Sequence, residues 1–142
     1  MAGSNFLDAN VWIALLWERH VHFERAREWF DNADDEELLF CRVTQMAVLR
    51  LLTTEAVMGV DTRSMAGAWT AWDQLAADSR IVYMAEPAGL DREFRARSRL
   101  SSRSPKVWAD AYLLAFAAAA GATLVTFDRS LRSRSENVLV LL

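Results

Sequence analysis

Short apolar runs alternate with longer amphipathic segments along the whole chain, and this alternation constrains the fold more than any other feature of the sequence. Each apolar run is too short for a helix, and the segment that follows it has apolar residues at helical spacing. Continuous apolar runs of this length are typical of strands that are buried on both faces. The sequence therefore predicts an α/β fold, a three-layer α/β/α sandwich around a mostly parallel sheet of about five strands.

The expected strands cover residues 5–7, 38–41, 81–84, 123–127 and 138–141. The expected helices cover residues 11–17, 22–32, 44–53, 64–78, 90–98 and 107–120. We expect Thr44 and Ser64 to cap the helices that they begin, because their hydroxyls can accept hydrogen bonds from free amides in the first turn. Met65, Trp69 and Trp72 recur at helical spacing, which predicts a face packed in the core. A partner-binding groove is the second interpretation of this face.

The length and composition of the chain indicate one globular domain. Its 142 residues lie in the usual range for one domain and contain no linker or repeat, so we expect a single domain over residues 1–142. The N-terminus lacks the pattern of a signal peptide, and the lone Cys41 cannot form an internal disulfide, which predicts a cytoplasmic location. Residues 111–127 carry no charge, but they are too few for a membrane span and Gly121 divides them. We therefore expect no membrane partner.

Basic residues are concentrated in the second half of the chain. The net charge is −3, yet residues 95–134 contain eight bases against two acids, a local charge of +6. Fifteen of the sixteen bases are Arg, whose guanidinium can hold a phosphate through two parallel hydrogen bonds. Arg95, Arg97, Arg99 and Arg103 are therefore candidates for contacts with a phosphate backbone. A solvated basic face is the alternative.

Three aspartates are expected at one edge of the sheet. Asp8 follows the first strand, Asp128 follows the fourth, and Asp110 is expected in the first turn of the long helix. Sites in open parallel sheets form outside the carboxyl ends of the strands, so these side chains are expected to converge there. Each aspartate also has a structural interpretation as a helix cap, a helix-dipole partner or a turn cap. Trp12 and Trp108 are near them in sequence, and one of the two is expected to line the crevice.

Three neighbouring carboxylates favour a metal site. They repel one another unless a cation holds them as anions, and hard cations such as Mg²⁺ or Mn²⁺ prefer oxygen ligands. Such an ion lowers the pKa of bound water and stabilises charge on a phosphate. The sequence therefore predicts metal-dependent hydrolysis of phosphodiester bonds.

Three segments together resemble a known family. They are FLDANVWIALLWERHVHFERA, CRVTQMAVLRLLT and WADAYLLAFAAAAGATLVTFDRSL, and they are similar to the PIN-domain ribonuclease toxins of bacterial VapBC toxin–antitoxin modules. The resemblance implies a metal-dependent endoribonuclease that cuts RNA, inhibits translation, forms a homodimer and is held inactive by an antitoxin. It implies that Asp8, Asp110 and Asp128 are the catalytic and metal-binding acids and that Asn10 supports Asp8.

The sequence departs from the family pattern in the helix expected over residues 44–53. Most PIN nucleases have a Glu where this chain has Ala47, and the nearby Gln45 is neutral. The Gln45 amide is a candidate support for a metal-bound water, whereas Glu55 lies beyond the helix and is a poor substitute. Arg50, the only charge in this helix, has two open interpretations, a carboxylate partner or an RNA contact. An alternative function is therefore a catalytically weak scaffold that binds RNA or antitoxin without efficient cleavage.

Overall fold

The five strands of the protein form one parallel sheet in the order β3-β2-β1-β4-β5. The computed structural model describes residues 3–142. The strands are β1 (Ser4–Leu7), β2 (Glu37–Phe40), β3 (Ile81–Tyr83), β4 (Thr123–Thr126) and β5 (Val138–Val140). The chain passes from β1 outward to β3 and then returns to β4 on the other side of β1, so the strand order reverses between β1 and β4. Ligand sites in such sheets form at this reversal.

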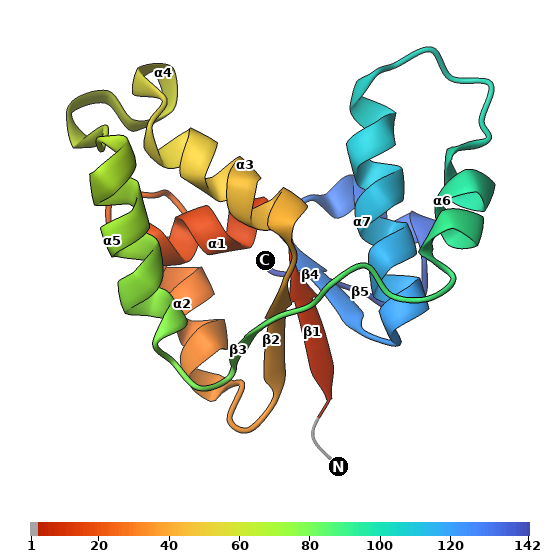
Figure 1. Cartoon of the computed structure of the whole chain (residues 1–142), viewed down its shortest axis with the longest axis horizontal. Helices are drawn as coiled ribbons and strands as arrows, with labels where there is room; N and C mark the ends of the chain where they lie inside the picture. Colours follow the sequence, from red (N-terminus) through yellow and green to blue (C-terminus); the bar gives the residue numbers. More distant parts are fainter. Residues whose placement is uncertain (1–2) are drawn as a thin grey trace.

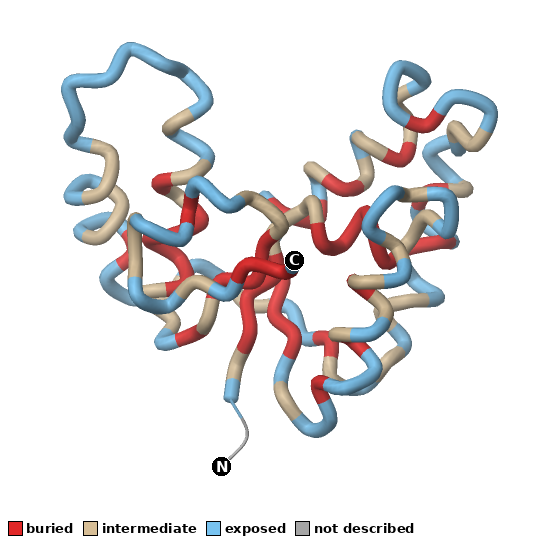
Figure 2. The backbone as a smooth tube through the Cα atoms, turned by 180° about the vertical axis from the view of Figure 1, so that it is seen from behind, coloured by how far each residue is buried: buried red, intermediate tan, exposed pale blue. Residues whose placement is uncertain are grey.

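Helices cover both faces of the sheet, which confirms the predicted three-layer architecture (Figure 1). One layer contains α1 (Ala9–Leu16), α2 (Phe23–Asn32), α3 (Arg42–Leu52), α4 (Glu55–Met58), η1 (Gly59–Asp61) and α5 (Met65–Ala76). The opposite layer contains α6 (Leu90–Ser98) and α7 (Lys106–Ala120), and the short 3-10 helix η2 (Arg129–Arg134) follows β4. Figure 2 shows that the buried backbone is concentrated in the central strands and in the helix faces turned toward them.

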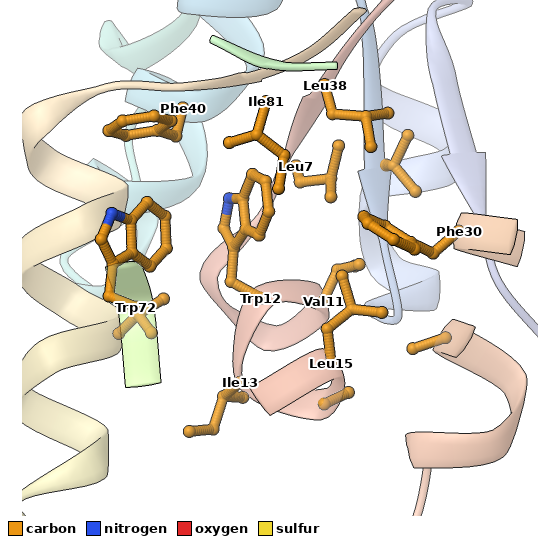
Figure 3. Packing of buried hydrophobic residues seen from close by; sticks show 14 of the residues in the cluster. Leu7, Val11, Trp12, Ile13, Leu15, Phe30, Leu38, Phe40, Trp72 and Ile81 are labelled. Atoms are coloured by element: carbon orange, nitrogen blue, oxygen red, sulfur yellow. The ribbon is translucent and has the colours of Figure 1, made fainter. Parts of the chain in front are cut away.

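The apolar runs are continuous because neighbouring strand residues pack against opposite layers. Phe6 points into the α7 layer and stacks on Phe116 with ring centroids 4.3 Å apart. Its neighbour Leu7 belongs to the other cluster, around Trp12 (Figure 3). The Trp12 ring is fully buried and meets the Trp72 ring edge to face, with centroids 5.3 Å apart. Trp12 is therefore a core residue and does not line a crevice.

The predicted helix starts are right for α5 and wrong for α3. Ser64 caps α5 by accepting a hydrogen bond from the Gly67 amide at 3.0 Å. The chain turns immediately after β2, so α3 begins at Arg42 with Cys41 as its N-cap, two residues earlier than expected. Thr44 lies inside the first turn, where its hydroxyl accepts from the Cys41 amide at 3.1 Å. The hydroxyl still satisfies a free amide, but from within the helix.

The stripe of Met65, Trp69 and Trp72 divides between the core and the surface. Trp72 is 2% exposed, whereas Met65 is 78% and Trp69 44% exposed, so the predicted core face is right for Trp72 alone. Met65 and Trp69 line a hollow of about 230 Å³ between α3 and α5, together with Arg50. This hollow contains no acid, so Arg50 has no carboxylate partner within it.

The connection between α3 and α5 contains the short helices α4 and η1, which the sequence did not indicate. No single helix within residues 3–142 is long and apolar enough to cross a membrane. The pair formed by α3 and the α4–η1 segment meets the requirements of length and composition only together, with a bend of 66° between its two parts.

Candidate active site

Asp8 and Asp128 lie just after the ends of the adjacent strands β1 and β4. Leu7 pairs with Val125 in the parallel ladder, and the Asp8 amide extends the pairing by donating to the Val125 carbonyl at 2.9 Å. Asp128 follows the end of β4 by two residues. Both acids therefore leave the sheet at its carboxyl edge, at the reversal of strand order.

Thr126, the last residue of β4, connects the groups at this edge. Its buried hydroxyl donates to Oδ2 of Asp8 at 2.8 Å. The same oxygen accepts from Nδ2 of Asn10 at 3.2 Å and from the amide of Asp128 at 3.0 Å. A hydroxyl has one donor and two acceptor positions, so the capacity of Thr126 is completely used. Thr126 thereby holds the Asp8 carboxylate in a fixed position relative to the backbone of Asp128.

Asn10 supports Asp8 indirectly. Its side-chain nitrogen donates to the Thr126 hydroxyl, and its side-chain oxygen accepts from the Phe127 amide at 3.2 Å. Both polar atoms of this amide group therefore bond to residues at the end of β4, which connects the start of α1 to that strand. The predicted support of the first acid acts through Thr126 and the β4 backbone.

The Asp8 side chain does not cap α1. Asp8 occupies the N-cap position, and its backbone carbonyl accepts from the amides of Val11 and Trp12 at 3.0 and 3.2 Å. Its carboxylate makes no side-chain capping hydrogen bond. The backbone of Asp8 therefore starts the helix, while its carboxylate remains available at the edge of the sheet.

Asp110 couples electrostatically to both other acids. Burial raises the pKa of Asp8, opposed by the Thr126 hydroxyl and the nearby amides of Asn10 and Ala9, and the charge of Asp110 raises that pKa further. Burial also raises the pKa of Asp110, and the charge of Asp128 adds to the increase, against the opposing charges of Arg134 and Lys106. The three carboxylates therefore share one electrostatic environment.

Asp110 lies just beyond the first turn of α7, because this helix begins at Lys106, and the first turn contains no acid. The alternative role of Asp110 as a helix-dipole partner is weakened by this position, since the dipole effect falls off within the first turn.

Asp128 differs from the other two acids in its hydrogen bonds. Its Oδ1 accepts from the amide of Ser130 at 2.9 Å and from the Ser130 hydroxyl at 2.7 Å. These bonds lower the pKa of Asp128, although partial burial opposes them. The predicted turn cap is thus present, and it occupies one carboxylate oxygen while Oδ2 accepts no hydrogen bond from residues 3–142.

The side chains at this edge are oxygen donors of the type that a hard divalent cation prefers, but within residues 3–142 they do not form the expected cluster of three. Burial, and to a smaller extent the charge of a neighbouring acid, raises the pKa of Asp8 and of Asp110, and a cation would favour the ionised form of both. No three His, Cys, Asp or Glu side chains within residues 3–142 are close enough together to form a metal-binding group. Mg²⁺ commonly binds through one or two carboxylates, with water and substrate phosphate completing the shell, so a preformed group of three is not required.

The amide oxygen of Gln45 is bound by a cation of its own helix. Gln45 is buried in α3, and its Oε1 accepts from the guanidinium of Arg42. Arg42 in turn lies over the ring of Tyr83 on the outer strand β3, with its guanidinium carbon 5.4 Å from the ring centroid. Ala47 is half-buried on the same helix, and Glu55 is exposed at the start of α4. No carboxylate in α3 replaces the missing Glu.

The four candidate phosphate contacts fall into two pairs. Arg95 forms an ion pair with Asp91 at 2.8 Å, and Arg97 pairs with Glu93 at 3.2 Å, both one turn apart on α6. Arg99 and Arg103 lie in the exposed segment between α6 and α7, and no salt bridge within the described part of the chain involves either of them. These two are therefore the more available cations.

The sequence did not indicate Thr126 as a site residue. Threonine is common in strands, and a single hydroxyl at the end of an apolar run gives no signal of function. The position two residues before Asp128, at the last residue of the strand, is the only feature that could have identified it.

Comparisons with known proteins match most of the chain. The PIN domain family matches residues 6–137. Ribonuclease VapC41 of Mycobacterium tuberculosis is 43% identical over 126 residues, which cover 85% of this chain and 86% of that protein. Ribonuclease VapC44 of the same organism is 36% identical, over 88% and 86% of the two chains.

Solved structures share the fold. The Sarcin-Ricin loop cleaving toxin VapC20 of Mycobacterium tuberculosis superposes with a TM-score of 0.68 at 13% identity, over 92% of this chain and 95% of that one. VapBC2 from Rickettsia felis, solved with a DNA fragment from its promoter, gives a TM-score of 0.60 at 11% identity, over 96% of both chains. The family match and the identity to the curated relatives decide the assignment: this chain belongs to the PIN-domain family, among the VapC ribonucleases.

Proposed function

We propose that this protein is the toxin of a toxin–antitoxin system, a metal-dependent endoribonuclease that hydrolyses RNA phosphodiester bonds and thereby inhibits translation. Asp8, Asp110 and Asp128 are the proposed catalytic and metal-binding residues. The observation that carries the proposal is the position of the Asp8 carboxylate, which the Thr126 hydroxyl holds at the reversal of strand order, where the charge of Asp110 also acts on it. The named relatives, which are ribonucleases, support the substrate class.

The acidic and basic side chains at this edge have different proposed roles. Asp8, fixed by Thr126, and Asp110 would hold Mg²⁺ or Mn²⁺, and Asp128 would contribute a further oxygen. When bound, the ion lowers the pKa of water, stabilises charge on the phosphate and orients the attack. Lys106 and Arg134, whose charges act on Asp110, are placed to attract the phosphate backbone to this edge.

RNA cleavage with and without metal tests the proposal. Purified protein is incubated with total RNA in EDTA, Mg²⁺ or Mn²⁺, alongside Asp8→Asn and Asp110→Asn. We expect cleavage only with metal, and a loss of at least about a hundredfold in both variants, since each removes a charge from the site. Asp73→Asn is the matched control, because Asp73 is an exposed acid on α5. Cleavage that persists in both site variants contradicts the assigned residues.

A catalytically weak scaffold is the second candidate function. The observation that favours it is α3, which contains no acid and whose Gln45 oxygen is engaged by Arg42. Under this hypothesis the protein binds RNA or antitoxin, yet no RNA is cut with Mg²⁺ or Mn²⁺. The same assay therefore separates the two functions.

The expected partners are an RNA substrate, a cognate antitoxin and a second copy of the chain. The solved relative VapBC2 carries both toxin and antitoxin in its name, which supports an antitoxin partner here. The hollow beside Met65 and Trp69 is the proposed antitoxin contact, since it exposes large apolar side chains. Light scattering of the chain alone tests the homodimer, and light scattering with the product of the neighbouring gene tests the antitoxin complex.

The proposed location is the cytoplasm. Cys41 is a buried free thiol, consistent with a reducing cytoplasm.

A further inference from the structure

Trp108 is the most exposed aromatic side chain near the proposed active site. It is 59% exposed on α7, two residues before Asp110, and its ring packs against Phe94 of α6 with centroids 6.0 Å apart. Residues two apart on a helix project about 200° from each other, so Trp108 and Asp110 face different sides of α7. The tryptophan therefore does not belong to the carboxylate cluster.

Two hollows meet at Trp108. One, of about 360 Å³, lies between α6 and α7 and is lined by Phe94, Arg99 and the Asp91–Arg95 ion pair, whose two charges offset each other. The other, of about 180 Å³, lies under the segment before α7 and is lined by Arg103 and three serines. The indole forms a wall of both hollows, so each has an aromatic surface and an available cation.

We infer that Trp108 is a stacking platform for an unpaired nucleobase of the RNA, and that Arg99 and Arg103 hold the phosphates on either side of that base. The inference rests on the proposed function and names the form of its substrate, a single strand. Aromatic side chains bind single-stranded nucleic acid by stacking on the bases, and neighbouring cations follow the backbone. In a duplex, each base face is already covered by its neighbours, so a double strand cannot use this platform.

The composition of the surface favours RNA over an acidic peptide. An acidic peptide would be bound by the cations alone, whereas this surface combines a largely exposed tryptophan with one cation in each of the two hollows that it lines. The position also suits a nucleic acid, because Trp108 shares the first part of α7 with Lys106 and Asp110. Because Trp108 and Asp110 face different sides of α7, a strand that reaches both passes around the N-terminal end of this helix.

Equilibrium binding to a labelled RNA tests this inference separately from catalysis. We would measure the affinity for a single-stranded RNA of about 12 nucleotides, within the length that such grooves occupy, in EDTA so that no cleavage occurs. The variants are Trp108→Ala, Trp108→Phe and Tyr83→Ala. Tyr83 is the matched control, because it is also a half-exposed aromatic residue but lies on β3, the outer strand on the other side of the sheet from β5. A duplex of the same length and a poly-glutamate peptide are the comparison ligands.

The expected result is a loss of about tenfold in single-strand affinity for Trp108→Ala, the effect of one stacked base. Trp108→Phe should recover most of the affinity, since a smaller aromatic ring still stacks, and Tyr83→Ala should bind like the wild type. Unchanged affinity of Trp108→Ala overturns the inference, as does a loss that appears equally with the duplex or with the peptide. If Trp108-dependent binding is found but no RNA is cut with Mg²⁺ or Mn²⁺, the proposed catalysis fails while the stacking platform stands.

Discussion

The hydroxyl of Thr126 donates to the Asp8 carboxylate at 2.8 Å, across the boundary between β4 and β1. The bond joins residues 118 positions apart in the sequence. It exists because β1 and β4 are neighbours in the sheet and end at the same level. Asp8, near the start of the sequence, is therefore positioned by β4, a strand near its end.

Thr126→Val should destabilise the protein and change the acid side of its pH profile. Valine keeps the shape of threonine but leaves Asp8, Asn10 and the Asp128 amide without a partner, at a cost of about 1 to 3 kcal/mol. The hydroxyl lowers the pKa of Asp8, so its removal raises that pKa further. Urea unfolding measures the first effect, and the pH dependence of RNA cleavage should show the acid limb shifted to higher pH. Thr126→Ser keeps the hydroxyl and should restore both properties.

Asp110→Asn should stabilise the metal-free protein at neutral pH. Its carboxyl has a raised pKa, so the folded state binds a proton more readily than the unfolded state. Ionisation therefore opposes folding, and the penalty develops as pH rises from the ordinary pKa of 3.8 through the folded value. Melting temperatures of wild type and variant in EDTA should converge in acid and separate at neutral pH. Saturating Mg²⁺ should remove the advantage of the variant, and an advantage that persists with metal contradicts the proposed ligand role.

Asp128→Asn should destabilise the metal-free protein at neutral pH, which is the opposite of the effect expected for Asp110→Asn. The bonds from Ser130 lower the pKa of Asp128, so its ionised form stabilises the fold above the ordinary value, and this contribution is lost as pH falls through the folded pKa. The variant should melt below the wild type at neutral pH, and the difference should shrink in strong acid. Equal melting temperatures at pH 7 in EDTA contradict the assigned turn bonds.

Arg99→Ala and Arg103→Ala should each reduce the salt dependence of RNA binding. Neither side chain has a salt bridge within residues 3–142, so each is available to displace a counterion from phosphate. The slope of log affinity against log salt should fall by about 0.7 for each, the value for single strands. Arg95→Ala is the control, because Arg95 is paired with Asp91 and should change the slope less. Equal slopes for all four proteins exclude the predicted phosphate contacts.

The layers of the fold were predictable because both faces of the sheet are covered. Phe6 and Leu7 are adjacent and both fully buried, one against each layer, so the strand is visible as an unbroken apolar run. The acids at the ends of β1 and β4 were predictable for the same reason, since the end of an apolar run marks the end of the strand. The short helices α4 and η2 have no apolar periodicity of sufficient length and were not identified.

Contacts between distant segments were not predictable. Trp12 and Trp108 are both near a site acid in sequence, yet Trp12 is fully buried against Trp72 and Trp108 is largely exposed. Only the packing of α5 over α1 distinguishes them. The bond between Thr126 and Asp8 depends on the strand order in the same way. A single sequence contains no information on which hydroxyl meets which carboxylate across a sheet.

The flank of α3 nearer Asp8 is the flank that contains Ala47. Gln45 lies on the side of Arg42, whose guanidinium covers Tyr83 of the outer strand β3. Residues 45 and 47 project about 200° apart on a helix, so Ala47 points toward the opposite flank. Since β1 lies on the other side of β2 from β3, that flank is the side of Asp8.

Ala47→Glu should therefore tighten Mn²⁺ binding by about tenfold, since a further carboxylate near Asp8 attracts the cation through the low-dielectric edge of the site. Calorimetric titration of Mn²⁺ into wild type and variant measures the change. The same titration of Met46→Glu is the control, because Met46 is exposed on α3 and projects about 100° away from Ala47. An affinity that is unchanged in Ala47→Glu, or raised equally in both variants, would show that position 47 does not face the metal. The position that corresponds to the Glu of most PIN nucleases would then be a residue other than Ala47.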